Sequence, residues 1–189
     1  DSNVTEENKH NKKLERLGFS YERGGVHTAR TMMLAELRAL VGTLELWLPA
    51  VTAVVRRDAA GDEEILLTRR ADNGEWAPVT GILDPGEEPA VGAAREALEE
   101  TGVVVSVDRL ASVSSSPQVV HGNGDLGVYL DLTFDCTWVS GEARVNDDEN
   151  VDVRWWPTDA LPPMSDWLRQ RIDDVLAGET AARFRGGPS

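Results

Sequence analysis

A strict alternation of apolar and polar residues runs from residue 128 to residue 138. The apolar positions are Val128, Leu130, Leu132, Phe134, Cys136 and Trp138. Successive side chains of a strand point to opposite faces, so this period of two predicts a strand with one buried face. The pattern also places Cys136 in the core, and a single cysteine excludes an internal disulfide framework.

Other apolar runs predict further strands and helices on both sides of that segment. Short runs rich in aliphatic residues predict strands over residues 48–56, 64–70, 103–107, 110–114 and 151–156. Apolar residues at helical spacing predict helices over about residues 28–41 and 164–176. The polar and charged residues 1–26 are predicted to form a flexible arm.

A third helix is predicted over residues 89–101. Pro89 suits the first helical position, where its missing N–H needs no partner, and Gly102 supplies the left-handed residue that closes many helices. Glu96, Glu99 and Glu100 fall within about 60° of one another around this helix. The opposite side carries alanines and Leu98, and we expect that side to pack against a sheet.

The three clustered glutamates have two interpretations. They repel one another, which costs a few tenths of a kcal/mol for each pair. A solvated acidic face would tolerate this repulsion, whereas a bound divalent cation would relieve it. Ligands that offer only oxygen favour Mg²⁺ or Mn²⁺ over zinc.

The residues around this helix fit one specific string, G-x5-E-x7-R-E-U-x-E-E-x-G-U, where U is aliphatic. The positions in register are Gly81, Glu87, Arg95, Glu96, Glu99, Glu100, Gly102 and Val103. This stretch resembles the Nudix box, the motif of the Nudix hydrolase family. Ala97 is a small variant at the first aliphatic position. Val79-Thr80 stands where many relatives have Pro-Gly, which leaves the local backbone path open.

The resemblance implies an α/β fold, a Nudix α/β/α sandwich with a mixed central sheet. Here the fold is expected to carry an N-terminal helical extension. We therefore predict an arm and amphipathic helix in residues 1–46, a Nudix domain in residues 47–180 and a flexible tail in residues 181–189.

The resemblance also implies a reaction, the metal-dependent hydrolysis of a diphosphate bond by attack of water on phosphorus. The expected substrate is a nucleoside diphosphate derivative such as ADP-ribose, or a nucleoside triphosphate. Glu96, Glu99 and Glu100 would bind Mg²⁺ or Mn²⁺, and Glu99 or Glu100 would also help to activate water. The resemblance gives supporting roles to the Gly81 carbonyl as a further ligand, to Arg95 as the residue that orients a glutamate, and to Glu87 and Gly102 as structural residues.

Candidates outside the box have weaker support. Glu149 resembles a downstream acid that some relatives use as an extra ligand or general base, although an ordinary acidic turn explains it as well. Arg69 and Arg70 are candidate contacts to substrate phosphates, because guanidinium groups pair well with phosphate oxygens. Trp76 is a candidate for stacking on a base. Simple surface or loop positions are the alternative for all three.

The net charge and the composition of the chain limit the classes of partner that we expect. A net charge of −14 argues against a general nucleic-acid binder, and no apolar run is long enough for a membrane span. We expect a nucleotide-type small molecule as the partner and a cytoplasmic location. The apolar stripe of the 28–41 helix packs on its own domain or forms a homodimer contact.

Two other functions remain open. Some Nudix-like domains bind nucleotides or sugars as sensors without turnover, although such domains often lose the carboxylates that this chain keeps. A diphosphate isomerase of the same superfamily fits less well, because those enzymes rely on a cysteine before the box, whereas Cys136 follows it.

Overall fold

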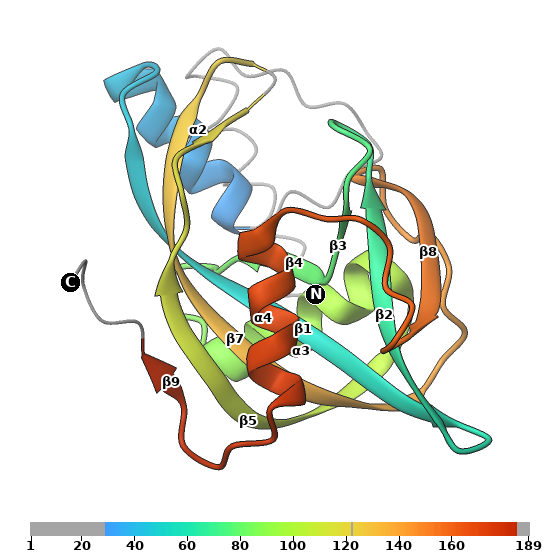
Figure 1. The fold of residues 1–189 in the computed structure, drawn as a ribbon. Helices are drawn as coiled ribbons and strands as arrows, with labels where there is room; N and C mark the ends of the chain where they lie inside the picture. The colour runs from blue at the N-terminus through green and yellow to red at the C-terminus, as the bar shows by residue number, and fades with distance from the viewer. Residues whose placement is uncertain (1–28, 122, 185–189) are drawn as a thin grey trace, which may run out of the picture.

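A mixed β-sheet organises the part of the chain that this computed structural model describes, residues 29–121 and 123–184 (Figure 1). The predicted arm, residues 1–26, lies outside the described residues, as do residues 185–189 of the predicted tail. The long strands are β1 (Leu46–Ala59), β2 (Asp62–Arg70), β5 (Val104–Ser115), β7 (Leu126–Ser140) and β8 (Asn150–Pro157). The short strands are β3 (Trp76–Ala77), β4 (Val79–Ile82), β6 (Val119–Val120) and β9 (Arg183–Phe184).

The strand order along the sheet is β3-β2-β1-β7-β5-β9, with β4 paired to β1, β6 to β7 and β8 to β2. Strands β1 and β7 run parallel at the centre, as do β5 and β9 at one edge, while the other pairs are antiparallel. The alternating segment predicted from the sequence is β7, and its Cys136 is buried. The predicted mixed sheet is therefore confirmed.

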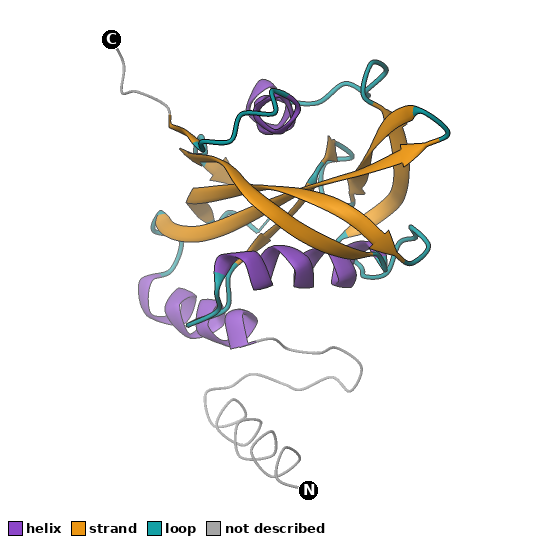
Figure 2. Ribbon diagram, turned by 90° about the horizontal axis from the view of Figure 1, so that it is seen from below, coloured by secondary structure: helices purple, strands orange, loops and turns teal. Residues whose placement is uncertain are grey.

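Helices cover both faces of this sheet (Figure 2). Helix α3 (Pro89–Thr101) contacts β1, β4 and β5, and helix α4 (Asp166–Leu176) contacts β1, β5 and β7 from the other side. Two separate groups of buried residues fill the layers. One group includes Val51, Leu66 and Ala97 beneath α3, and the other includes Leu67 and Ile172 beneath α4. The α/β/α sandwich is therefore confirmed.

Helix α2 (Ala29–Val41) precedes the sheet and corresponds to the predicted N-terminal helix. Arg38 fastens it to the β6–β7 hairpin. Its guanidinium group donates to the Leu126 carbonyl at 2.8 Å and forms an ion pair with Asp125 at 3.2 Å. The same side chain also donates to the Leu44 carbonyl at 2.6 Å, which closes the link between α2 and β1.

Two predictions differ from the observed strands. Residues 103–107 and 110–114 were expected to form separate strands, but β5 is continuous, with register shifts against β7 between Val107 and Arg109 and between Leu110 and Ser112. These bulges accommodate the polar Asp108-Arg109 segment without ending the strand. The predicted tail from residue 181 includes β9, which pairs with β5.

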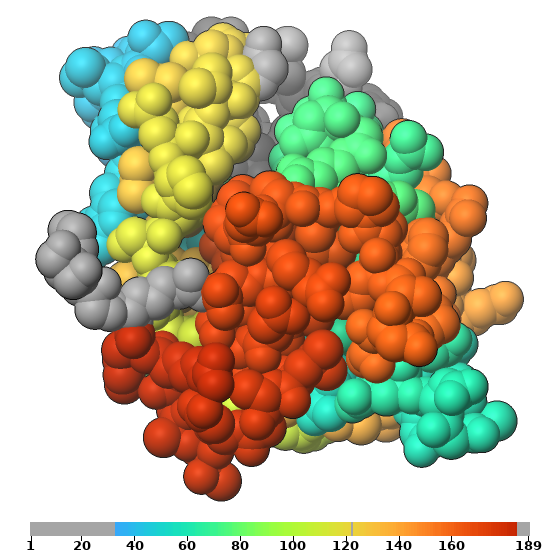
Figure 3. Space-filling model, viewed as in Figure 1, coloured from blue at the N-terminus to red at the C-terminus, as the bar shows by residue number. Residues whose placement is uncertain are grey.

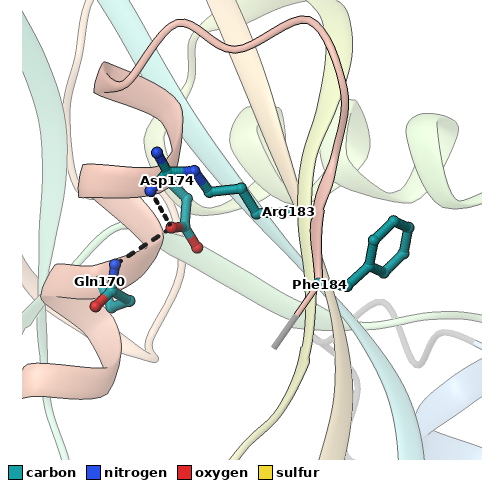
Figure 4. Close-up of a pocket in the computed structure, with 4 residues that line it drawn as sticks. All are labelled: Gln170, Asp174, Arg183 and Phe184. Atoms are coloured by element: carbon teal, nitrogen blue, oxygen red, sulfur yellow. Dashed lines mark hydrogen bonds and ion pairs between the residues drawn. The ribbon is translucent and has the colours of Figure 1, made fainter. Parts of the chain in front are cut away.

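Figure 3 shows the face of the molecule that carries α4. An open hollow lies on this face near the C-terminal end of the described chain (Figure 4). Gln170, Asp174, Arg183 and Phe184 line it. The Asp174 carboxylate accepts a hydrogen bond from the Gln170 amide at 3.2 Å and pairs with Arg183 at 3.5 Å. This hollow is on the opposite side of the sheet from α3, so it does not include the glutamates of the box.

Candidate active site

The ends of α3 form as the sequence predicts. Pro89 stands at the start of the helix, and Gly102 adopts a left-handed conformation with φ of 72°. The Gly102 N–H donates to the Leu98 carbonyl at 3.0 Å, which satisfies one of the last carbonyls of the helix. This cap fixes the position of the three glutamates in the last turns of α3.

The side of α3 that packs against the sheet differs from the predicted one. The buried residues of α3 are Gly92, Ala93, Glu96, Ala97, Glu100 and Thr101. Leu98, which was expected to pack inward, is 48% exposed. The helix is rotated so that Glu96 and Glu100 lie on the buried side and Glu99 lies at its exposed margin. The alternative of a fully solvated acidic face is therefore wrong for two of the three glutamates.

Glu96 packs directly beneath Gly81 of β4. A Cβ atom at residue 81 would overlap the Glu96 carboxyl group, so only glycine leaves room for that carboxylate. Gly81 pairs with Val51 of β1, which holds the β4 backbone over the helix. The Gly81 position of the box is thus explained by close approach of a carboxylate rather than by a special backbone angle.

Glu100 is a buried carboxylate among acidic neighbours. It is 5% exposed, and its Oε2 accepts a hydrogen bond from Asn150 Nδ2 at 2.9 Å. Burial raises the pKa of Glu100 well above its ordinary value, the Asn150 hydrogen bond opposes that shift, and the nearby charges of Glu96, Asp147 and Glu149 add to it. A cation at this carboxylate would replace the proton that burial favours.

Arg95 holds the box together. Its guanidinium group donates two parallel hydrogen bonds to Glu87, both at 2.8 Å, and Nη1 donates to Glu96 at 2.9 Å and to Glu99 at 2.8 Å. Hydrogen bonding to Glu87, followed by the charge and hydrogen bond of Glu96 and the hydrogen bond of Glu99, raises the pKa of Arg95 against the opposing effect of burial. Glu87 also accepts the backbone N–H of Asp84 at 3.0 Å, so it ties the loop before α3 to the helix.

Arg70 and Glu149 lie near the same carboxylates. Arg70 forms a two-pronged ion pair with Asp72, and this pairing, with weaker attraction from Glu100 and Glu149, raises the pKa of Arg70. The backbone N–H of Ala71 donates to the Glu149 carbonyl at 2.8 Å. Arg70 and Glu149 are therefore brought to the box, with the Glu149 side chain exposed.

Arg69 and Trp76 have other contacts. Arg69 is exposed and donates to the Gly74 carbonyl at 3.1 Å, within its own loop. The Trp76 ring meets Trp156 edge to face, with centroids 5.3 Å apart, and packs with the residues beneath α4. These contacts favour a role for Trp76 in shaping the loop, and its stacking on a base stays a prediction.

Sequence reasoning missed two residues of this site, Asp147 and Asn150. Asn150 is 6% exposed and donates to Glu100 and to Asp147 Oδ1, the latter at 3.3 Å. Both belong to the acidic stretch 146–150, in which only Glu149 matched a known pattern. No local signal distinguishes Asn150, because its role depends on pairing between strands β2 and β8.

The chemistry of these residues fits a hard divalent cation. All the donors are oxygens, and the close approach of Glu96 to Gly81 places a carboxylate beside a backbone peptide. Among the described residues, no three His, Cys, Asp or Glu side chains converge as a ligand set. Arg95 engages Glu96 and Glu99 instead, and it supplies the positive charge that their proximity requires.

Comparison with known proteins identifies the class that this fold and site define. The NUDIX domain matches residues 47–177, and on this evidence the chain belongs to that family. The resemblance to the Nudix family predicted from the sequence is therefore confirmed. The prediction that this chain is a Nudix-type enzyme is confirmed as well.

Individual relatives agree with this class. A MutT-like protein of Streptomyces ambofaciens is 35% identical over 68% of this chain and 77% of its own length. The NAD-capped RNA hydrolase NudC of Pseudomonas aeruginosa is 34% identical over 71% of this chain, which spans only 46% of that protein. The structure of a NUDIX hydrolase from Nitrosomonas europaea superposes with a TM-score of 0.57 at 26% identity, over 72% of this chain and 93% of that one.

None of the helices in residues 29–121 and 123–184 combines the length and the apolar composition that a membrane span requires.

Proposed function

We propose that this protein hydrolyses a diphosphate linkage in a nucleotide-type substrate with the help of a bound divalent cation. The substrate class is a nucleoside diphosphate derivative such as ADP-ribose, or a nucleoside triphosphate. Family membership supports the reaction class, and the names of relatives such as NudC support a nucleotide substrate.

One structural observation carries the proposal. Glu100 is buried and lies among the charges of Glu96, Asp147 and Glu149. In the described contacts its carboxylate accepts a hydrogen bond from the neutral Asn150 amide, while Arg70, whose charge attracts it, forms its ion pair with Asp72. Burying a carboxylate with no cation in direct contact is costly, so packing alone does not favour this arrangement. Binding of Mg²⁺ or Mn²⁺ removes that cost, and the cation then neutralises the negative charge that develops on phosphate.

The residues of the site divide into four proposed roles. Glu96, Glu99, Glu100 and the Gly81 carbonyl hold the cation. Glu99, Glu100 and Glu149 remain the candidates for activating the attacking water, and Glu149 is also a candidate extra ligand. Arg70 is favoured over Arg69 as the phosphate contact, because Glu100 and Glu149 attract Arg70, whereas Arg69 donates to the Gly74 carbonyl within its own loop. Arg95 orients Glu96, while Glu87 and Gly102 keep the loop and the helix end in place.

The test is a substrate screen with the purified full chain. Nucleoside triphosphates, ADP-ribose, dinucleoside polyphosphates, NADH and coenzyme A are incubated with Mg²⁺ or Mn²⁺, and products are read by mass spectrometry. We expect cleavage of one class only with metal, and a fall of about a hundredfold or more in Glu100→Gln. Glu88→Gln, which changes an exposed glutamate at an unspecified position of the motif, is the matched control and should retain activity.

The sensor hypothesis makes the opposite prediction. It is favoured by the pairing of Glu96 and Glu99 with Arg95, which leaves the described acids without a formed ligand set. A sensor would be stabilised by one ligand of the panel with no product under either metal. Full activity in Glu100→Gln would contradict the metal assignment itself.

A further inference from the structure

Residues 141–150 wrap around the C-terminal end of α3. The Asn146 N–H donates to the Glu100 carbonyl at 3.1 Å, and the Asn146 amide donates to the carbonyls of Leu98 and Glu99 at 3.3 and 3.0 Å. Close by, the Arg144 N–H donates to the Thr101 carbonyl at 3.0 Å. The last carbonyls of a helix have no partner within the helix, so this loop satisfies them.

Asn150 makes a different kind of contact. Its Nδ2 atom reaches the Glu100 carboxylate itself and also reaches the Asp147 carboxylate. Asn150 opens β8 and pairs with Arg70 at the bulge between β2 and β8, so a strand rather than a loop fixes its position. The buried Asn150 amide thus connects the Glu100 carboxylate of α3 to the Asp147 carboxylate of the acidic stretch 146–150.

We propose that Asn150 is the positioning residue for Glu100, orienting its carboxylate for the cation and linking it to Asp147. This inference rests on the proposed function. By donating to Oε2, the amide would restrict the orientation of the Glu100 carboxyl group, whose remaining lone pairs could then hold a cation. Neutral donors that orient metal ligands in this way commonly change metal affinity by about 10- to 100-fold when they are removed.

A purely structural role is the competing explanation. Asn150 is buried, and its loss would leave the Glu100 carboxylate without this hydrogen bond, which lowers stability whether or not a cation binds. The two roles differ in what they do to metal affinity. Asn146 provides the comparison, because it fastens the same loop to the same helix through carbonyl groups and touches no glutamate carboxylate in the described contacts.

The experiment measures Mn²⁺ binding to the full chain by electron paramagnetic resonance of the free ion, with thermal unfolding of the metal-free protein alongside. Asn150→Leu keeps a similar volume and removes the donor, and Asn150→Ala repeats the test without bulk if the leucine variant does not fold. We expect both to weaken Mn²⁺ binding about tenfold and to raise the Mg²⁺ concentration for half-maximal turnover by a similar factor. Asn146→Ala should lower the unfolding temperature and leave the Mn²⁺ dissociation constant within about twofold of wild type.

The outcomes separate this inference from the function on which it rests. Absence of Mn²⁺ binding in the wild type, or unchanged binding in Glu100→Gln, would overturn the proposed cation site and the inference together. Weaker binding in Glu100→Gln with unchanged binding in both Asn150 variants would overturn the inference alone. Equal weakening by Asn146→Ala would also overturn it, because loop fastening would then explain the effect.

Discussion

Arg95 lies between three glutamates, and its guanidinium group donates to each of them. Glu87 and Arg95 are largely buried, at 11% and 18% side-chain exposure, so removal of the arginine would take away the guanidinium group with which the Glu87 carboxylate is paired. We expect Arg95→Ala to lower the free energy of unfolding by about 2 to 4 kcal/mol. Urea denaturation followed by circular dichroism would measure this change.

Arg95→Lys is the control for charge in that experiment. Lysine keeps the positive charge but cannot donate two parallel hydrogen bonds to Glu87, so it should recover only part of the lost stability. Full recovery by lysine would show that charge alone matters. A loss below about 0.5 kcal/mol in Arg95→Ala would place the pair among ordinary surface ion pairs and contradict its buried role.

Gly81 gives a second prediction at the scale of one residue. A methyl group at this position would overlap the Glu96 carboxyl group, so we expect Gly81→Ala to displace Glu96 and reduce turnover about tenfold or more. Gly61→Ala is the matched control, because Gly61 lies in the β1–β2 turn with φ of 99° and open space around it. That variant should lose stability through backbone strain and keep its activity. Turnover rates and unfolding temperatures of the two variants would check both expectations.

The sequence predicted which residues of the box lie together better than it predicted how they are buried. The spacing of Gly81, Glu87 and Arg95 was visible because a motif specifies residue types in order. The inward orientation of Glu96 and Glu100 was not, because a helical wheel favours burying Leu98 over a carboxylate. Asn150 was missed for a related reason, since its position beside Glu100 depends on the pairing of β8 with β2.

At the scale of elements, Arg38 connects α2 to the rest of the described fold. Its guanidinium group contacts the Leu126 carbonyl, Asp125 and the Leu44 carbonyl. We expect Arg38→Ala to increase amide hydrogen exchange in residues 29–41 about tenfold, because local opening of this helix becomes easier while the sheet stays closed. Mass-spectrometric exchange would measure it. Arg169→Ala, which removes an exposed pair with Asp173 on α4, should leave exchange in α2 unchanged. Unchanged exchange in Arg38→Ala would contradict the fastening role.

The elements also show where sequence patterns suffice. Both ends of α3 were predicted to the residue, because Pro89 and Gly102 act through the local backbone. Strand β5 was divided wrongly, since the polar Asp108-Arg109 segment resembles a turn until its pairing with β7 is known. The two residues of β9 carry no strand pattern, and only the exposed edge of β5 makes them a strand.

At the scale of the whole molecule, one sheet connects two groups of buried side chains that do not share residues. Leu66 packs in the group beneath α3, and its neighbour Leu67 packs in the group beneath α4. Both are fully buried, and they point to opposite faces because they are adjacent on β2. A cavity on either face of the sheet therefore weakens the packing of the same strand, β2, and the hydrogen bonds that this strand makes with its neighbours.

We expect Leu66→Ala and Leu67→Ala each to cost about 2 to 5 kcal/mol and to keep a single unfolding transition. Tryptophan fluorescence and far-ultraviolet circular dichroism should give the same midpoint in each variant, because neither layer can remain folded once the sheet separates. Trp76 and Trp156 pack in the layer beneath α4 and Trp155 packs in the layer beneath α3, so fluorescence reports on both layers. If Leu66→Ala unfolded in two steps, with this fluorescence change separated from the loss of helix and strand signal, the two layers would be independent units. A single coincident transition in both variants would establish that the layer beneath α3, which holds the box glutamates, unfolds together with the layer beneath α4.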